Sequence, residues 1–96
     1  MKMVIEKGTA KNKKFKAIFF DGDKKVKTSQ FGDIRYEDYT QHKDKSRRTK
    51  YRNRHKVNLP KTNYMSPAHL SYYILWGAYT DINKNISAYK RKFNLT

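Results

Sequence analysis

The sequence predicts an α+β fold for this chain of 96 residues, with antiparallel strands first and helices after them. The dipeptide Asp21-Gly22, a strong hairpin signal, separates two segments rich in β-branched and aromatic residues. Residues 66–94 instead carry apolar side chains three or four positions apart, as on one face of a helix. A chain of this length forms one small domain, which buries about 60–65 % of its unfolded surface.

The first part of the chain is expected to form a three-stranded antiparallel meander at residues 2–7, 13–20 and 24–31. A type I′ turn at Asp21-Gly22 would join the second strand to the third. Successive side chains in a strand point to opposite faces, which predicts the two faces of the second strand. One face carries Phe15, Ala17 and Phe19, and the other carries Lys14, Lys16, Ile18 and Phe20.

A strongly basic helix is expected over residues 43–59, after an extended connector that completes residues 1–42. Asp44 suits an N-cap, and the twelve residues after it contain neither Gly nor Pro. Tyr51 and His55 fall on one face at i, i+4, which gives the helix a thin apolar stripe.

Residues 66–94 are expected to form a helical hairpin. Ser66 suits the N-cap of its first helix, Pro67 the first helical position, and Gly77 the C-terminal cap. The stripe of the first helix consists of Leu70, Tyr73, Ile74 and Gly77. The second helix has an N-cap at Thr80 or Asp81, a stripe of Ile82, Ile86, Tyr89 and Phe93, and Lys90, Arg91 and Lys92 in its last turn.

The charge of the chain limits its possible partners. The sequence has 23 basic and 8 acidic residues, a net charge of +15, which favours nucleic acid, an anionic membrane or an acidic protein surface. The longest apolar run, residues 72–76, is too short to span a membrane, so we expect no membrane insertion. No signal-peptide core is present at residues 1–10, which predicts a location inside the host cell or inside a particle assembled there. The oligomeric state is left open.

Residues 42–56 concentrate eight Lys or Arg side chains and one carboxylate, Asp44. Like charges at i, i+4 cost a helix roughly 0.2–0.5 kcal/mol per pair. A bound polyanion would turn this cost into affinity, and a merely solvated face is the alternative interpretation. Arginines are the stronger candidates, because a guanidinium makes two-pronged hydrogen bonds to phosphate. The predicted nucleic-acid-binding residues are Lys43, Lys45, Arg47, Arg48, Lys50, Arg52, Arg54 and Lys56.

The sequence offers little for catalysis. Its three histidines, His42, His55 and His69, lack the cysteines or acidic clusters of a complete zinc site, and no Gly-rich phosphate loop is present. We therefore expect no catalytic residues, no metal and no cofactor. Aromatic side chains could stack on bases, but their spacing favours the core. These residues are Tyr64, Tyr72, Tyr73, Trp76 and Tyr79 in the last third, and Phe15, Phe19 and Phe20 on the second strand.

Four segments in this order, "DYTQHKD", "RRTKYRNRH", "LSYYILWG" and "NISAYKRKFNL", resemble a family of small basic proteins of unknown function. The family occurs in large double-stranded DNA viruses of algae and amoebae, of the chlorovirus and mimivirus kind. The resemblance covers nearly the whole chain, although Lys45 stands where family members have Pro. It implies a viral origin and a location in the virion, and it implies no activity.

These observations together predict a non-enzymatic, basic, virion-associated protein that binds a polyanion, the packaged DNA, by charge neutralisation. A minor capsid or cement protein that binds acidic surfaces of larger capsid proteins is the second hypothesis. Aromatic anchors at Phe31, Tyr36 and Tyr39 would carry that second role. The third hypothesis is an enzyme, such as a nuclease.

Overall fold

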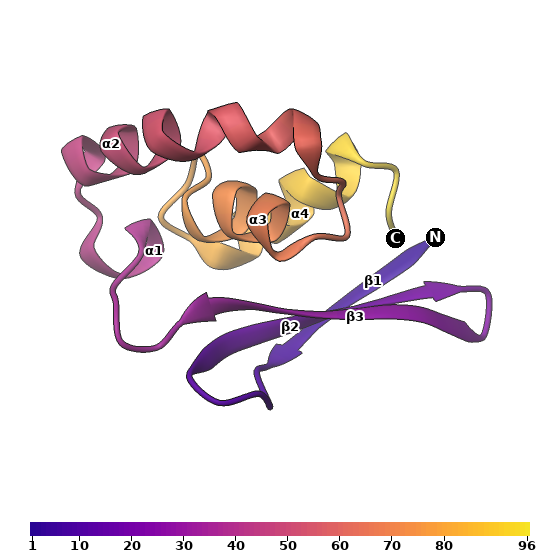
Figure 1. Cartoon of the computed structure of the whole chain (residues 1–96). Coiled ribbons are helices and arrows are strands. Elements are labelled where there is room, and N and C mark those ends of the chain that lie inside the picture. The colour runs from indigo at the N-terminus through magenta and orange to yellow at the C-terminus, as the bar shows by residue number, and fades with distance from the viewer.

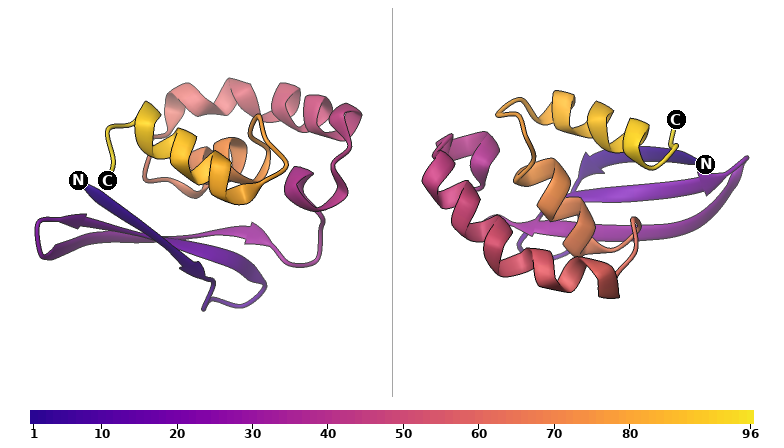
Figure 2. Two further views of the ribbon diagram at one scale, coloured as in Figure 1. Left: turned by 180° about the vertical axis from the view of Figure 1, so that it is seen from behind. Right: turned by 90° about the horizontal axis from the view of Figure 1, so that it is seen from above.

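The structure is a computed structural model that describes all 96 residues. A three-stranded sheet forms one layer, and every helix lies on the same face of it (Figures 1 and 2). The predicted α+β class is therefore confirmed. The two ends of the chain lie side by side, because the amide of Met3 donates to the carbonyl of Thr96 at 3.2 Å and the amide of Thr96 donates to the carbonyl of Met1 at 3.0 Å.

The sheet is the predicted antiparallel meander, with the order β1-β2-β3. Its strands are β1 (Lys2–Lys7), β2 (Lys13–Asp21) and β3 (Lys24–Asp33), which agree with the predicted bounds to within two residues. Alternation along β2 directs one set of side chains toward the helices. The opposed pairs of that set are Met3 with Phe19, Ile5 with Ala17, and Phe15 with Phe31.

The turn between β2 and β3 differs from the predicted one. Asp21 pairs with Lys24, so the two central residues are Gly22 and Asp23 rather than Asp21 and Gly22. Gly22 has a φ of +61°, whereas Asp23 is not among the residues with positive φ. This is the pattern of a type II′ turn, in which only the first central residue needs positive φ and glycine provides it. The predicted type I′ turn is therefore wrong.

The hydrophobic core lies between the sheet and the helices, and both ends of the chain contribute to it. Each of its nine residues is almost completely buried, and half-buried side chains such as Phe15 and Tyr73 pack around them. Such a cluster is the main source of stability in a small domain. Its members are Met3, Ala17, Phe19, Phe31, Leu70, Ile74, Leu75, Tyr89 and Leu95.

The connector after β3 contains a short helix, α1 (Tyr39–His42), so the predicted extended conformation is wrong there. Asp38 is its N-cap, and the side chain of Asp38 accepts a hydrogen bond from the amide of Thr40 at 2.9 Å. The side chain of Gln41 accepts one from the amide of Asp38 at 3.0 Å, which completes a capping box. Lys43, with a φ of 59°, ends the helix in the left-handed conformation.

The basic helix α2 (Lys45–His55) is shorter than the predicted range 43–59. Asp44 is its N-cap, as predicted, and accepts hydrogen bonds from two backbone amides of the first turn. A 3₁₀-helix, Lys56–Lys61, follows α2 and includes Pro60. Proline has no amide hydrogen and clashes with the preceding turn, which explains why the α-helix does not continue.

The predicted helical hairpin is confirmed at the C-terminal end. Its first arm is α3 (Pro67–Leu70), which continues into a π-helical turn, Ser71–Leu75, and its second arm is α4 (Ile82–Lys92). Ser66 caps α3 with Pro67 at the first helical position, as predicted, and Asp81 caps α4. The two arms pack against each other and against the sheet (Figure 2).

Gly77 does not form the predicted left-handed cap, because its φ is not positive and Trp76 ends the helical turn. Glycine is needed at this position because neighbouring atoms leave no room for a side chain. A Cβ at this position would lie 2.1 Å from the carbonyl oxygen of Tyr73 and 2.8 Å from Oδ1 of Asn85. A side chain would therefore force the hairpin arms apart.

His69 in α3 should make the stability of the fold depend on pH. Its ring is buried, and burial lowers the pKa of the imidazole below the ordinary value of 6.5. The unfolded chain therefore binds the proton more readily. The stability contributed by the neutral ring is present above the unfolded pKa and is lost as the pH falls toward the folded pKa.

We expect urea titrations to show a lower free energy of unfolding at about pH 5 than at about pH 7. His69→Gln should have a smaller difference between these two conditions. His55→Gln should also have a smaller difference, because burial and the nearby Arg54 lower the pKa of His55 as well. Equal differences in the wild type and His69→Gln would contradict the expectation.

Candidate nucleic-acid interface

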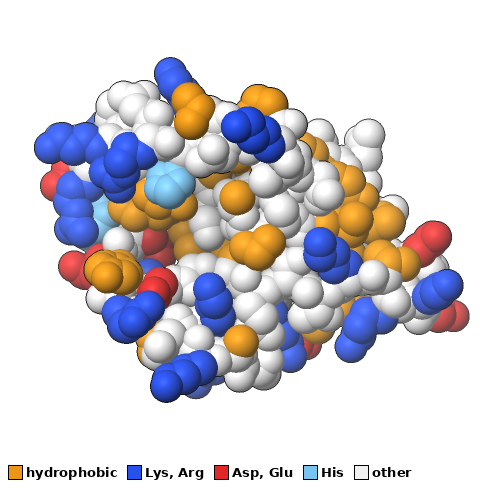
Figure 3. Space-filling view, in the orientation of Figure 1, with side chains coloured by type: hydrophobic (Ala, Val, Ile, Leu, Met, Phe, Trp, Pro, Cys, Tyr) orange, Lys and Arg blue, Asp and Glu red, His pale blue; other side chains and the backbone are white.

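The structure divides the eight predicted contact residues between positions 43 and 56 into two groups. Six have exposed side chains whose charged groups make no hydrogen bond or ion pair with the protein. Lys and Arg side chains gather over the end of the molecule where α1 and α2 meet (Figure 3). The six free cations are Lys43, Lys45, Arg47, Lys50, Arg54 and Lys56.

Arg48 and Arg52 form the second group and point inward. Nε of Arg48 donates to the carbonyl of Gly77 at 2.7 Å, and Nη1 of Arg52 donates to the carbonyls of Tyr72 at 3.0 Å and Trp76 at 2.7 Å. Burial is the main cause that lowers the pKa of the Arg52 guanidinium. These two arginines satisfy carbonyls at the end of a helical turn, so they hold α2 in place and are less available to a ligand.

Five aromatic rings form a column along the inner side of α1 and α2. Tyr51 stacks on Trp76 with centroids 4.2 Å apart and planes 6° apart, and His55 stacks on the other face of Tyr51, also at 4.2 Å. His42 lies 5.2 Å from Trp76, and Tyr39 lies 6.3 Å from His42. Burial is the main cause that raises the pKa of the Tyr51 hydroxyl. The thin stripe predicted for the basic helix is therefore one side of this column.

A buried ion pair joins β2 to α1. Nζ of Lys14 lies 2.7 Å from Oδ2 of Asp38 and donates to Oε1 of Gln41 at 2.6 Å. Only 4 % of the Asp38 side chain is exposed. A buried carboxylate needs a cation and further hydrogen-bond donors, and Lys14, Thr40 and the α1 amides provide them. This contact fixes the beginning of α1 and hence the direction in which α2 leaves it.

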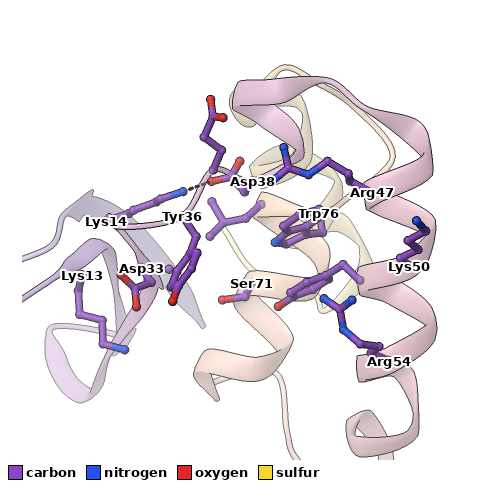
Figure 4. A pocket seen from close by; sticks show the side chains of 14 residues that line it. Lys13, Lys14, Asp33, Tyr36, Asp38, Arg47, Lys50, Arg54, Ser71 and Trp76 are labelled. Carbon is purple, nitrogen blue, oxygen red and sulfur yellow. Dashed lines mark hydrogen bonds and ion pairs between the residues drawn. The ribbon is translucent and has the colours of Figure 1, made fainter.

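A groove of about 470 Å³ lies between α2 and the opposite wall, which β2, β3 and the connector form (Figure 4). Arg47 and Arg54 extend from α2 toward that wall, and Lys50 lies between them on the same helix. Tyr36 stands on the opposite wall, and Trp76 lies between the two sides. The groove therefore combines cations with aromatic side chains.

The groove carries a net positive charge. Two of its three carboxylates already have a basic partner, because Asp38 pairs with Lys14 and Asp33 pairs with Arg35 at 2.7 Å. The hydrogen bond from the Arg35 side chain is the main cause that lowers the pKa of Asp33 to about 2. The unpaired charges are then one carboxylate and four cations, a net charge of +3. They belong to Glu37, Lys13, Arg47, Lys50 and Arg54.

The sequence did not predict the contribution of the opposite wall. Lys13 and Tyr36 belong to segments interpreted as a strand end and an extended connector, about ten to forty residues from α2 in the sequence. One signal was present, since Asp38 and Gln41 have the spacing of a capping box and indicate that a helix begins there. A helix at that point folds the connector back beside α2.

The aromatic residues considered as possible stacking partners have different environments. Tyr72 and Phe19 are buried, as expected of core residues. Tyr64, Tyr73, Trp76, Phe15 and Phe20 are half-buried, and Trp76 lies in the column rather than in the core cluster. Tyr79 is 44 % exposed. Tyr36, which was considered only as an anchor for a protein partner, is the most exposed tyrosine at 68 %.

No three His, Cys, Asp or Glu side chains come together in an arrangement that could hold a metal ion. None of the helices combines the length and the apolar character that crossing a bilayer requires.

Comparison with known proteins gives one match. No curated protein and no solved structure matches the chain. Residues 3–55 match a protein family described as a family of unknown function, DUF5754, and they include α1, α2 and all of the sheet except Lys2. This match covers more than half of the 96 residues. The chain therefore belongs to the DUF5754 family.

Proposed function

We propose that the protein binds nucleic acid without catalysing a reaction, through phosphate contacts made by the free cations of the α2 segment. The observation that carries this proposal is that none of the six free cations has a carboxylate partner, although the chain contains eight acidic residues. The three ion pairs of the structure are made by other basic residues. A dense, unpaired array of Lys and Arg along one exposed helical segment suits a polyanion.

The energetics of α2 support the same proposal. Lys50 and Arg54 are both free and stand at i, i+4, a like-charge spacing that costs roughly 0.2–0.5 kcal/mol. The first turn of α2 has basic residues where the helix dipole favours anions, and only Asp44 compensates for them. A row of phosphates along the side of α2 that carries Arg47, Lys50 and Arg54 would offset the like-charge cost and part of the dipole cost.

Packaged DNA is the polyanion that we propose, and the virion is the proposed location. The resemblance to small basic proteins of large double-stranded DNA viruses supports this step, and the net charge of +15 suits neutralisation of a packaged genome. Binding of this kind depends little on base sequence, because phosphate contacts carry no sequence information.

Titration of a labelled duplex at several salt concentrations tests the proposal. We expect the slope of log K against log salt to be about −4 to −5, because about four to six phosphates are neutralised and each releases counterions. Changing Arg47, Lys50 or Arg54 singly to Gln should make the slope less negative by about one unit.

Arg91→Gln is the matched control, since Arg91 is an exposed arginine on α4 outside the groove. It should leave the slope nearly unchanged. A slope near zero, or equal changes from Arg91→Gln and from the α2 variants, would contradict binding through α2.

A minor capsid or cement role is the second candidate, and the exposed apolar side chains of the connector favour it. Ile34 is 60 % exposed and Tyr36 is 68 % exposed. The other two expected anchors, Phe31 and Tyr39, are buried in the fold and cannot contact a partner, which corrects the sequence-based expectation. Loss of Tyr36→Ala protein from assembled particles, with unchanged DNA affinity, would favour the capsid role.

A further inference from the structure

We propose that the groove between α2 and the connector binds an unpaired nucleobase of a single-stranded nucleic acid, with the neighbouring phosphates on Arg47, Lys50 and Arg54. This inference rests on the nucleic-acid binding proposed above and adds to it a contact with an unpaired base where a strand offers one. Contacts between phosphates and a helix surface need no groove, whereas an inserted base does. The volume of about 470 Å³ lies within the range of sites that take small planar ligands.

Tyr36 provides the surface on which the base would stack. Its ring is 68 % exposed, and it forms no pair with another aromatic ring of the protein. Trp76 and Tyr51 across the groove stack on each other, and their outer faces meet His42 and His55. Tyr36 is therefore the aromatic residue of the groove that is free for a ligand, while the Trp76 and Tyr51 pair forms an apolar boundary (Figure 4).

The positions of the cations favour a strand over a single nucleotide. Arg47, Lys50 and Arg54 stand at i, i+3 and i+7, which places them on one side of α2. The seven-residue step from Arg47 to Arg54 corresponds to a rise of about 10 Å along the helix axis. This length exceeds the size of one phosphate group and suits consecutive phosphates of a strand that follows the groove.

Binding measurements with three labelled ligands test the inference. The ligands are an oligothymidine single strand, a duplex of the same length, and a strand with the same number of phosphates but with abasic sugars. We expect the wild type to bind the oligothymidine more tightly than the abasic strand. Tyr36→Leu should weaken binding of the oligothymidine by about 5- to 30-fold and leave the abasic strand and the duplex unchanged, because only stacking is lost.

Tyr79→Leu is the matched control, since Tyr79 is also an exposed tyrosine and lies outside the groove. It should bind all three ligands as the wild type does. Tyr36 is exposed, so its replacement should leave the circular dichroism spectrum and the melting temperature unchanged.

Four outcomes would overturn the inference. Equal binding of the oligothymidine and the abasic strand, or an oligothymidine affinity unaffected by Tyr36→Leu, would rule out base insertion while leaving phosphate binding by α2 intact. Displacement of the oligothymidine by an equal concentration of thymidine monophosphate would assign the groove to a free nucleotide. Failure to bind any of the three ligands would contradict the proposed function itself.

Discussion

Replacing Lys14 with Met should lower the free energy of unfolding by about 3–5 kcal/mol, because it leaves a buried carboxylate without its cation. The Lys14 and Asp38 side chains are 10 % and 4 % exposed, so water cannot easily replace the ammonium group. Methionine keeps most of the volume of the lysine stem, and the effect would therefore report the charge rather than a cavity. Chemical denaturation followed by circular dichroism measures it.

Lys16→Met is the matched control on the same strand. Lys16 lies 3.6 Å from Glu6, whose side chain is 52 % exposed, and exposed pairs contribute about 0–1 kcal/mol. The double variant Lys14→Met with Asp38→Asn should recover much of the stability, since it contains no unpaired charge. Equal stability of Lys14→Met and Lys16→Met would show that Asp38 is solvated and that the pair does not fix α1.

Replacing Asn85 with Leu should also cost about 3–5 kcal/mol, because it leaves one buried and two partly buried backbone groups without partners. Asn85 is 2 % exposed, and its Nδ2 donates to the carbonyls of Ile74 and Tyr79, each at 2.8 Å. Its Oδ1 accepts from the amide of Tyr79 at 3.0 Å. One side chain thus holds both the π-helical turn and the loop that leads to α4.

Asn83→Leu is the control for this prediction. Asn83 is exposed on the same helix, and its side chain makes no hydrogen bond with the protein, so the change should alter stability by less than about 0.5 kcal/mol. A small effect of Asn85→Leu in the same urea titration would mean that water satisfies the loop and that Asn85 is not its main support.

The parts of the fold that local sequence determines were predicted correctly. The strands around Gly22 and the arms of the C-terminal hairpin follow from alternation, apolar periodicity and capping residues, all of which lie within a few positions of each other. Helix α1 was missed because four residues carry no periodic stripe, and only the capping box of Asp38 and Gln41 marks them. The turn type was wrong because pairing across the hairpin, and not the dipeptide alone, selects the central residues.

The candidate site was predicted only in part, for a related reason. The charge density of the α2 segment is visible in the sequence, but the direction of each side chain depends on what α2 packs against. Arg48 and Arg52 face the carbonyls at the end of the π-helical turn, and this contact joins residues more than twenty positions apart. Tyr36 enters the groove only because α1 folds the connector back beside α2. No local pattern records either contact.

The composition of the core has a consequence for synthesis of the protein on the ribosome. Phe19 and Phe31 belong to the sheet, but their buried neighbours Leu70, Tyr89 and Leu95 are translated much later. At about 5–20 residues per second, residues 70–96 take about 1–5 s to be added after the sheet and α2 have been synthesised. During that interval the apolar face of the nascent meander is uncovered and its strand edges are unpaired. Both features favour capture by chaperones or aggregation. Conditions that slow elongation over residues 70–96 should therefore reduce the yield of folded protein more than conditions that slow it over residues 2–33.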